Sequence, residues 1–76
     1  MSKELPSLKP KQVIVALERA GFVAKRQTGS HVIFYKPDIR HPITVPNHTS
    51  DLPTGTLRAI IRQANLTVDE FISLLS

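Results

Sequence analysis

The chain has 76 residues, 41% hydrophobic and 21% charged, and this length predicts a single domain over residues 1–76 with one small core. The absence of cysteine excludes disulfides, a thiolate nucleophile and a cysteine-based zinc site. Lys and Arg number 10 against 6 Asp and Glu, and this net charge of +4 favours a polyanion such as nucleic acid as partner, although it can serve solubility alone.

The first predicted elements are a helix and a β-hairpin. We expect residues 1–9 to form a loose lead-in. Pro10 suits the first position of a helix, and apolar residues then recur at helical spacing until Gly21, which can adopt the left-handed cap; this predicts a helix over about 10–20. The segments FVAKRQ and HVIFYK predict two strands, joined by the turn TGS in which Gly29 supplies a positive φ.

The second half of the chain predicts one more strand and two helices. PDIRHP indicates a second turn, and ITVP a short third strand that ends at a proline. The loop NHTSDLPTG leads to a helix over about 55–64, after which Asn65 can take the left-handed conformation. Thr67 and Glu70 form a capping box that opens a short third helix.

The order α-β-β-β-α-α predicts an α+β fold in which the helices cover one face of a three-stranded antiparallel sheet. In the second strand the side chains alternate between two sets, His31, Ile33 and Tyr35 on one side and Val32, Phe34 and Lys36 on the other. Both sets contain large apolar groups, so the pattern does not decide which set meets the helices. Apolar side chains on the open face indicate a partner there or, equally well, imperfect patterning in a small sheet.

The candidates for chemistry are His31, His41 and His48. Their separations of ten and seven residues, without cysteine, do not form a metal-ligand pattern. Ser30 lacks the strand-turn-helix context of a nucleophilic serine, and no glycine-rich phosphate loop is present. We therefore expect no metal and no small-molecule cofactor. No apolar run reaches the roughly 18 residues of a membrane span, and no signal peptide is recognisable, so we expect a cytoplasmic protein without membrane contact.

RNA is a substrate that carries its own nucleophile, because its 2′-OH can attack the neighbouring phosphodiester. The reaction needs a base, an acid and cations, and an imidazole can make either proton transfer near neutral pH. His31, beside the hairpin turn, is the candidate, although a histidine at the start of a strand is more often an ordinary surface residue. The basic residues that we expect to hold the RNA backbone are Lys25, Arg26, Lys36, Arg58 and Arg62.

Four segments, ALERAGF, VAKRQTGSHVIFYKP, ITVPNH and GTLRAIIRQANLTVDEFISLL, together closely resemble the HicA family of toxins from bacterial toxin–antitoxin systems. The resemblance runs from about Val13 to Leu75. It implies a fold similar to the double-stranded-RNA-binding domain and a toxin of a type II system that cleaves mRNA as an endoribonuclease, with His31 as the catalytic residue. It also implies neutralisation by a HicB-type antitoxin that covers the active region.

Some positions leave alternatives open. His48 matches a recurring family histidine, and an auxiliary catalytic role, a structural role and an RNA contact all remain open for it. Lys9 replaces the Ser or Thr that often caps the first helix, which predicts a frayed start, and we expect His41 to be a solvated residue of the second turn. A non-enzymatic RNA-binding module on the same fold is the alternative function, but the intact His31 favours the ribonuclease. A DNA-binding partner of a repressor has no recognition-helix signature to support it.

Overall fold

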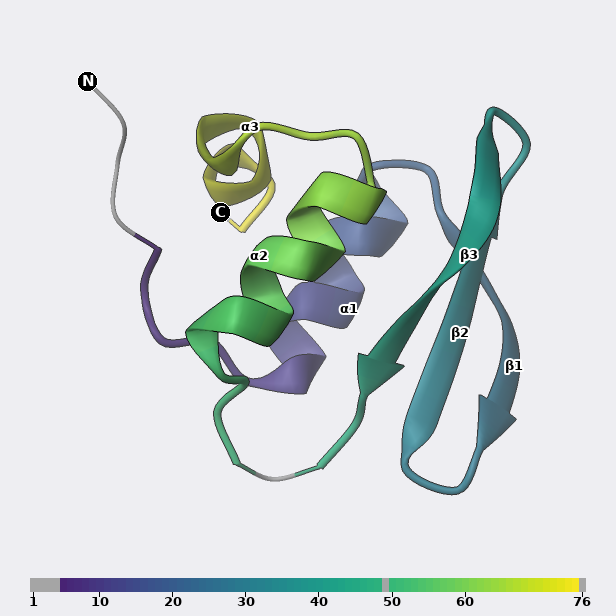
Figure 1. Cartoon of the computed structure of the whole chain (residues 1–76), viewed down its shortest axis with the longest axis horizontal. Helices are drawn as coiled ribbons and strands as arrows, with labels where there is room; N and C mark the ends of the chain where they lie inside the picture. The colour runs from purple at the N-terminus through teal and green to yellow at the C-terminus, as the bar shows by residue number, and fades with distance from the viewer. Residues whose placement is uncertain (1–4, 49, 76) are drawn as a thin grey trace.

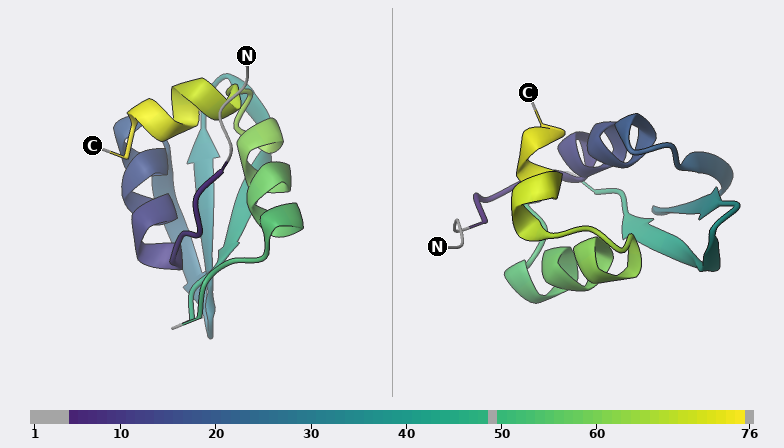
Figure 2. Two further views of the ribbon diagram at one scale, coloured as in Figure 1. Left: turned by 90° about the vertical axis from the view of Figure 1, so that its left-hand side faces the viewer. Right: turned by 90° about the horizontal axis from the view of Figure 1, so that it is seen from above.

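The elements of the computed structural model follow the predicted order (Figure 1). The structure describes residues 5–48 and 50–75. The helices are α1 (Pro10–Arg19), α2 (Thr54–Gln63) and α3 (Val68–Ser73), and the strands are β1 (Val23–Thr28), β2 (His31–Lys36) and β3 (Ile39–Pro46). The sheet is antiparallel with β2 in the centre. Helices α1 and α2 lie side by side on one face of the sheet, and α3 lies across them on the side away from it (Figure 2). The predicted α+β fold, similar to a double-stranded-RNA-binding domain, is confirmed.

The two faces of β2 differ in burial, which the sequence did not decide. Val32 and Phe34 are buried between the sheet and the helices, whereas His31 and Tyr35 are exposed on the open face and Ile33 is half-buried there. The helices and β3 supply most of the remaining core, through Val13, Ala16, Leu17, Ile43, Val45, Leu57, Ile60, Ile61 and Phe71. The open face of the sheet therefore carries the histidine.

The predicted caps at Gly21, Asn65 and Thr67 and the predicted turn at Gly29 are confirmed. Gly21 and Gly29 have φ of +100° and +53°, and Asn65 has φ of +60°, all in the region that L side chains rarely adopt. The capping box is complete, because the Glu70 N–H donates to Thr67 Oγ1 at 3.0 Å and the Thr67 N–H donates to Glu70 Oε1 at 2.8 Å. Local chemistry alone thus fixes most element boundaries.

The third strand is longer than predicted. The turn contains only Pro37 and Asp38, and β3 begins at Ile39, so the prediction of a turn through residue 42 was wrong. His41 accordingly lies in β3, exposed, and not in a loop. Pro42 suggested a break, but β3 is an edge strand, where the missing N–H of a proline costs no ladder hydrogen bond.

The segment before α1 is not loose within residues 5–9, contrary to the prediction; residues 1–4 lie outside the described ranges. Leu8 is 3% exposed, and its carbonyl accepts a hydrogen bond from the Leu52 N–H at 2.8 Å. Figure 2 shows this segment running between α1 and α2. The start of α1 is partly capped, because the Lys9 N–H donates to Gln12 Oε1 at 3.0 Å. Across residues 5–48 and 50–75, no helix is long and apolar enough to cross a membrane.

Candidate nucleic-acid interface

His31 opens β2 directly after the hairpin turn, and its imidazole is exposed on the open face of the sheet. Its backbone is paired on both sides, with Thr28 of β1 and with Pro46 of β3. The Asn47 N–H donates a hydrogen bond to the Ser30 carbonyl, which ties the end of β3 to the hairpin turn. The backbone that carries His31 is therefore held from two strands, while its ring remains accessible to a substrate.

Two of the predicted RNA-binding residues lie on the same face as His31. A β-bulge interrupts β1 just before Arg26, and the register that follows places Arg26 diagonal to His31, a position about 7–8 Å away between Cα atoms. Lys25 and Arg26 line a shallow hollow of about 290 Å³ with Tyr35. Cations that attract phosphates, beside an aromatic ring that can stack on a base, suit a single-stranded nucleic acid.

Lys36 lies at the opposite end of β2 from His31, about 17 Å away along an extended strand of five residue steps. Its Nζ lies 5.4 Å from the centroid of the Phe22 ring and 3.9 Å from Asp38 Oδ1. Both contacts hold the ammonium group near the second turn. The structure therefore does not bring Lys36 together with the histidine.

Arg58 and Arg62 are exposed on α2, one helical turn apart on the same side of the helix. They neighbour each other as the sequence predicted. Because α2 covers the inner face of the sheet, the two guanidinium groups belong to the helix layer and not to the open face (Figure 2). Lys36 and Lys25 line a further hollow with Tyr35, so three of the five predicted cations lie around Tyr35 and two lie on α2.

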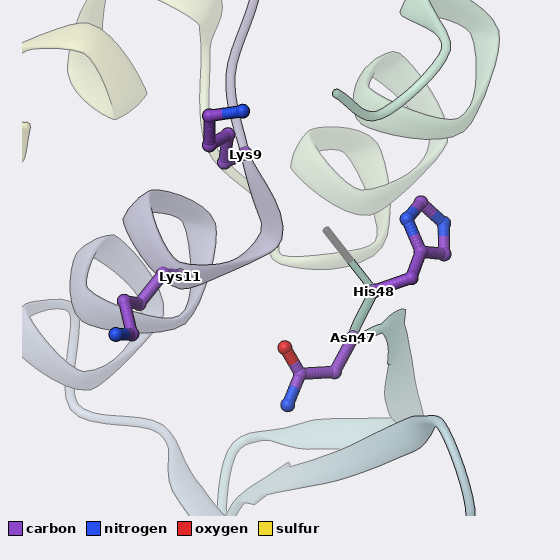
Figure 3. Close-up of a pocket in the computed structure, with 4 residues that line it drawn as sticks. All are labelled: Lys9, Lys11, Asn47 and His48. Carbon is purple, nitrogen blue, oxygen red and sulfur yellow. The ribbon is translucent and has the colours of Figure 1, made fainter. Parts of the chain in front are cut away.

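His48 lies just beyond β3, two residues after Pro46, and its imidazole is exposed. It lines a surface cleft of about 340 Å³ together with Asn47, Lys9 and Lys11 (Figure 3). Sequence reasoning missed Lys9, Lys11 and Asn47 as members of one site. The two lysines flanking the first residue of the helix were a visible signal, but nothing local indicated that they face the end of β3.

Of the three histidines, only His31 and His48 lie at the same end of the sheet. His41 lies in β3 about 17 Å along the strand from Pro46, the residue opposite His31. Within the part of the chain that the structure describes, no group of three or more His, Cys, Asp or Glu side chains is arranged to hold a metal ion.

Comparison with known families gives a match over most of the chain. A family model described as the HicA toxin of bacterial toxin–antitoxin systems matches residues 10–66, from the first residue of α1 to the residue after Asn65. The chain belongs to the HicA toxin family. As a HicA-family protein it is a toxin of a toxin–antitoxin system. The matched segment includes His31 and His48 and ends before α3. A search among curated protein sequences found no match.

Proposed function

We propose that this HicA-family toxin is an endoribonuclease that cleaves mRNA, with His31 as the catalytic residue. The observation that carries the proposal is an exposed imidazole on a backbone held from two strands, with a cationic neighbour on the same face. A group held in place by the fold reacts without first losing its own conformational freedom, which lowers the barrier to proton transfer.

The reaction uses only groups of the RNA and of the protein. One base removes the proton of the 2′-OH, the freed oxygen attacks the neighbouring phosphorus, and the bond to the 5′ oxygen breaks. An acid protonates that oxygen, leaving a 2′,3′-cyclic phosphate and a 5′-OH. His31 performs one of these transfers, and His48 is the candidate for the other. Arg26 and Lys25 stabilise the charge that accumulates on the phosphate oxygens.

The second proposed partner is a HicB-type antitoxin that covers the open face of the sheet. This face combines exposed apolar side chains with cations. Val23 is 53% exposed and Tyr35, its partner on β2, is 38% exposed, and the half-buried Ile33 lies two residues before Tyr35 on the same face. An antitoxin that buries these side chains also covers His31, so antitoxin and mRNA compete for one surface. We place both interactions in the cytoplasm, where mRNA is translated.

The proposed reaction is tested by asking whether RNA cleavage requires a metal ion. Purified toxin should cleave single-stranded RNA at an unchanged rate in EDTA, because the proposed chemistry needs no ion. The products should carry a 2′,3′-cyclic phosphate and a 5′-OH, which end-labelling and mass spectrometry identify. Cleavage lost in EDTA and restored by a divalent ion would replace this mechanism with metal catalysis. RNA that is bound and not cut would support the non-enzymatic RNA-binding module.

A further inference from the structure

The cleft lined by Lys9, Lys11, Asn47 and His48 is separate from the open face. It lies between the start of α1, where Lys9 and Lys11 lie, and the end of β3, which the Asn47 N–H ties to the hairpin turn (Figure 3). We propose that this cleft binds the phosphate of the RNA strand that neighbours the scissile phosphate at His31. The inference rests on the proposed ribonuclease function and gives a role to Lys9, Lys11 and Asn47, which that function does not use.

The chemistry of the lining suits a phosphodiester. Lys9 and Lys11 provide ammonium groups from the α1 side, and Asn47 directs its amide toward α1 from the end of β3, while both ammonium groups and the His48 ring are directed away from that amide (Figure 3). An amide NH2 and an imidazole N–H are both hydrogen-bond donors to phosphate oxygens. Among the described residues, the side chains of Lys11, Asn47 and His48 make no hydrogen bond or ion pair. These three groups can therefore turn to a ligand without breaking an existing contact.

Among the described residues, the carboxylate of Asp51 lies beside the cleft and reduces its positive charge. Lys9 Nζ lies 3.6 Å from Asp51 Oδ1, and both side chains are more than half exposed. An exposed pair of this kind contributes little to stability, so an incoming phosphate can replace the carboxylate at modest cost. Lys11 is then the principal cation of the cleft. Its long flexible stem lets the ammonium group, which is directed away from Asn47 in Figure 3, close over a bound phosphate.

The position of the cleft indicates which phosphate it takes. Pro46 lies opposite His31, so their Cα atoms are about 5 Å apart, and Asn47 follows at about 3.8 Å along the chain. The hydrogen bond from the Asn47 N–H to the Ser30 carbonyl fixes this proximity. A strand whose scissile phosphate lies at His31 on the open face therefore reaches the cleft by passing around the end of the sheet. The volume of about 340 Å³ is enough for a nucleotide-sized group.

The test uses the His31→Ala protein, which should bind RNA without cutting it, and adds one substitution at a time. Lys11→Gln should weaken binding of a short single-stranded RNA about fivefold at 0.1 M salt and reduce the log–log salt slope by about 0.7, the contribution of one phosphate contact. Asp51→Asn should tighten binding, because it removes the carboxylate that competes with phosphate for Lys9. Arg40→Gln is the matched control: it removes the same charge from the opposite end of β3 and should change neither quantity.

A chemical change in the RNA locates the contact. Replacing the phosphate next to the cleavage site by an uncharged methylphosphonate should weaken binding by His31→Ala, with no further loss when Lys11→Gln is added. If the Lys11→Gln and Arg40→Gln proteins have equal affinities and salt slopes while the wild-type toxin cleaves RNA, the cleft does not bind a phosphate. The proposed ribonuclease function is then unaffected. Wild-type toxin that neither binds nor cleaves RNA overturns both.

Discussion

At the scale of single residues, His31 combines a fixed backbone with a side chain that contributes nothing to the core. Its neighbours across the sheet, Thr28 and Pro46, hold the main chain, and the imidazole lies outside the buried cluster. Removal of an exposed side chain of this kind usually changes the free energy of unfolding by no more than about 0.5 kcal/mol. A loss of function at this position can thus be separated from a loss of folding.

The His31→Ala protein should fold, with a melting temperature within about 2–4 °C of the wild type for a domain of this size. Its rate of RNA cleavage should fall by about 10²–10⁴-fold, the usual contribution of one positioned acid or base. His41→Ala is the matched control, since it removes an exposed histidine from the same sheet, and should keep full activity. A His31→Ala protein that unfolds, or that cleaves at the wild-type rate, would remove this residue from the chemistry.

His48→Ala separates the two roles that remain for the second histidine. If His48 carries the second proton, its loss should lower kcat about as much as the loss of His31. If it serves only as a donor in the cleft, the variant should raise KM and leave kcat near the wild-type value. The two roles are thus distinguished by kinetic constants measured on one variant.

At the scale of elements, the helix boundaries could be predicted from residues with strong backbone preferences. Pro10 marks the start of α1, and Gly21 and Asn65 follow the last turns of α1 and α2, each through the backbone conformation that it favours. The start of β3 was missed because Pro42 suppresses a strand prediction unless the strand is known to lie at an edge. The lead-in was missed because Leu8 is buried by tertiary contacts, which no local pattern indicates.

The candidate site likewise has a part that the sequence indicated and a part that depends on tertiary packing. His31 became the catalytic candidate through the resemblance to the HicA family, whereas the face on which its side chain lies depends on which side of the sheet the helices cover. The cleft depends on tertiary structure entirely, since Lys11 and Asn47 are separated by 36 positions (47 minus 11) and no local pattern relates them. Local chemistry predicted the elements, and only packing revealed the surfaces.

The next prediction concerns the contact between the antitoxin and the open face of the sheet. Tyr35→Glu should weaken binding of a HicB-type antitoxin at least tenfold. The antitoxin would have to bury the new carboxylate without a partner, and removing a charge from water in this way costs on the order of several kcal/mol. Val15→Glu is the matched control, since Val15 is similarly exposed at 40% but lies on α1, in the helix layer. Isothermal titration of both variants gives the comparison. Equal losses for both, or a loss for Val15→Glu alone, would place the antitoxin on the helices.

At the scale of the whole molecule, the positive charge is distributed over separate surfaces. Lys25 and Arg26 lie on the open face, Lys9 and Lys11 line the cleft, and the two arginines of α2 lie in the helix layer. Long-range attraction of a polyanion depends on the total charge, but the salt dependence of binding counts only the cations that replace counterions at the contact. Salt dependence therefore shows which surface the RNA follows.

If Lys25, Arg26 and Lys11 each neutralise one phosphate, the log–log salt slope on single-stranded RNA should be about −2, at roughly −0.7 per contact. The double variant Lys25→Gln/Arg26→Gln should lose about two thirds of this slope. The double variant Arg58→Gln/Arg62→Gln removes the same charge from α2 and should leave the slope unchanged. A slope that depends on α2 instead would move the RNA to the helix layer.

The position of β1 at the edge of the sheet has a consequence for how these variants behave in solution. The outer backbone groups of an edge strand can pair with a strand of another molecule, and proteins often prevent this with bulges, charges or prolines. β1 has its bulge and the adjacent Lys25 and Arg26, and β3, the other edge, has Pro42 and Pro46. The cations that we expect to hold RNA thus also keep toxin molecules apart after release from an antitoxin. Glutamine at both positions should favour self-association, so a neutral variant needs light scattering before a weakened affinity is attributed to RNA.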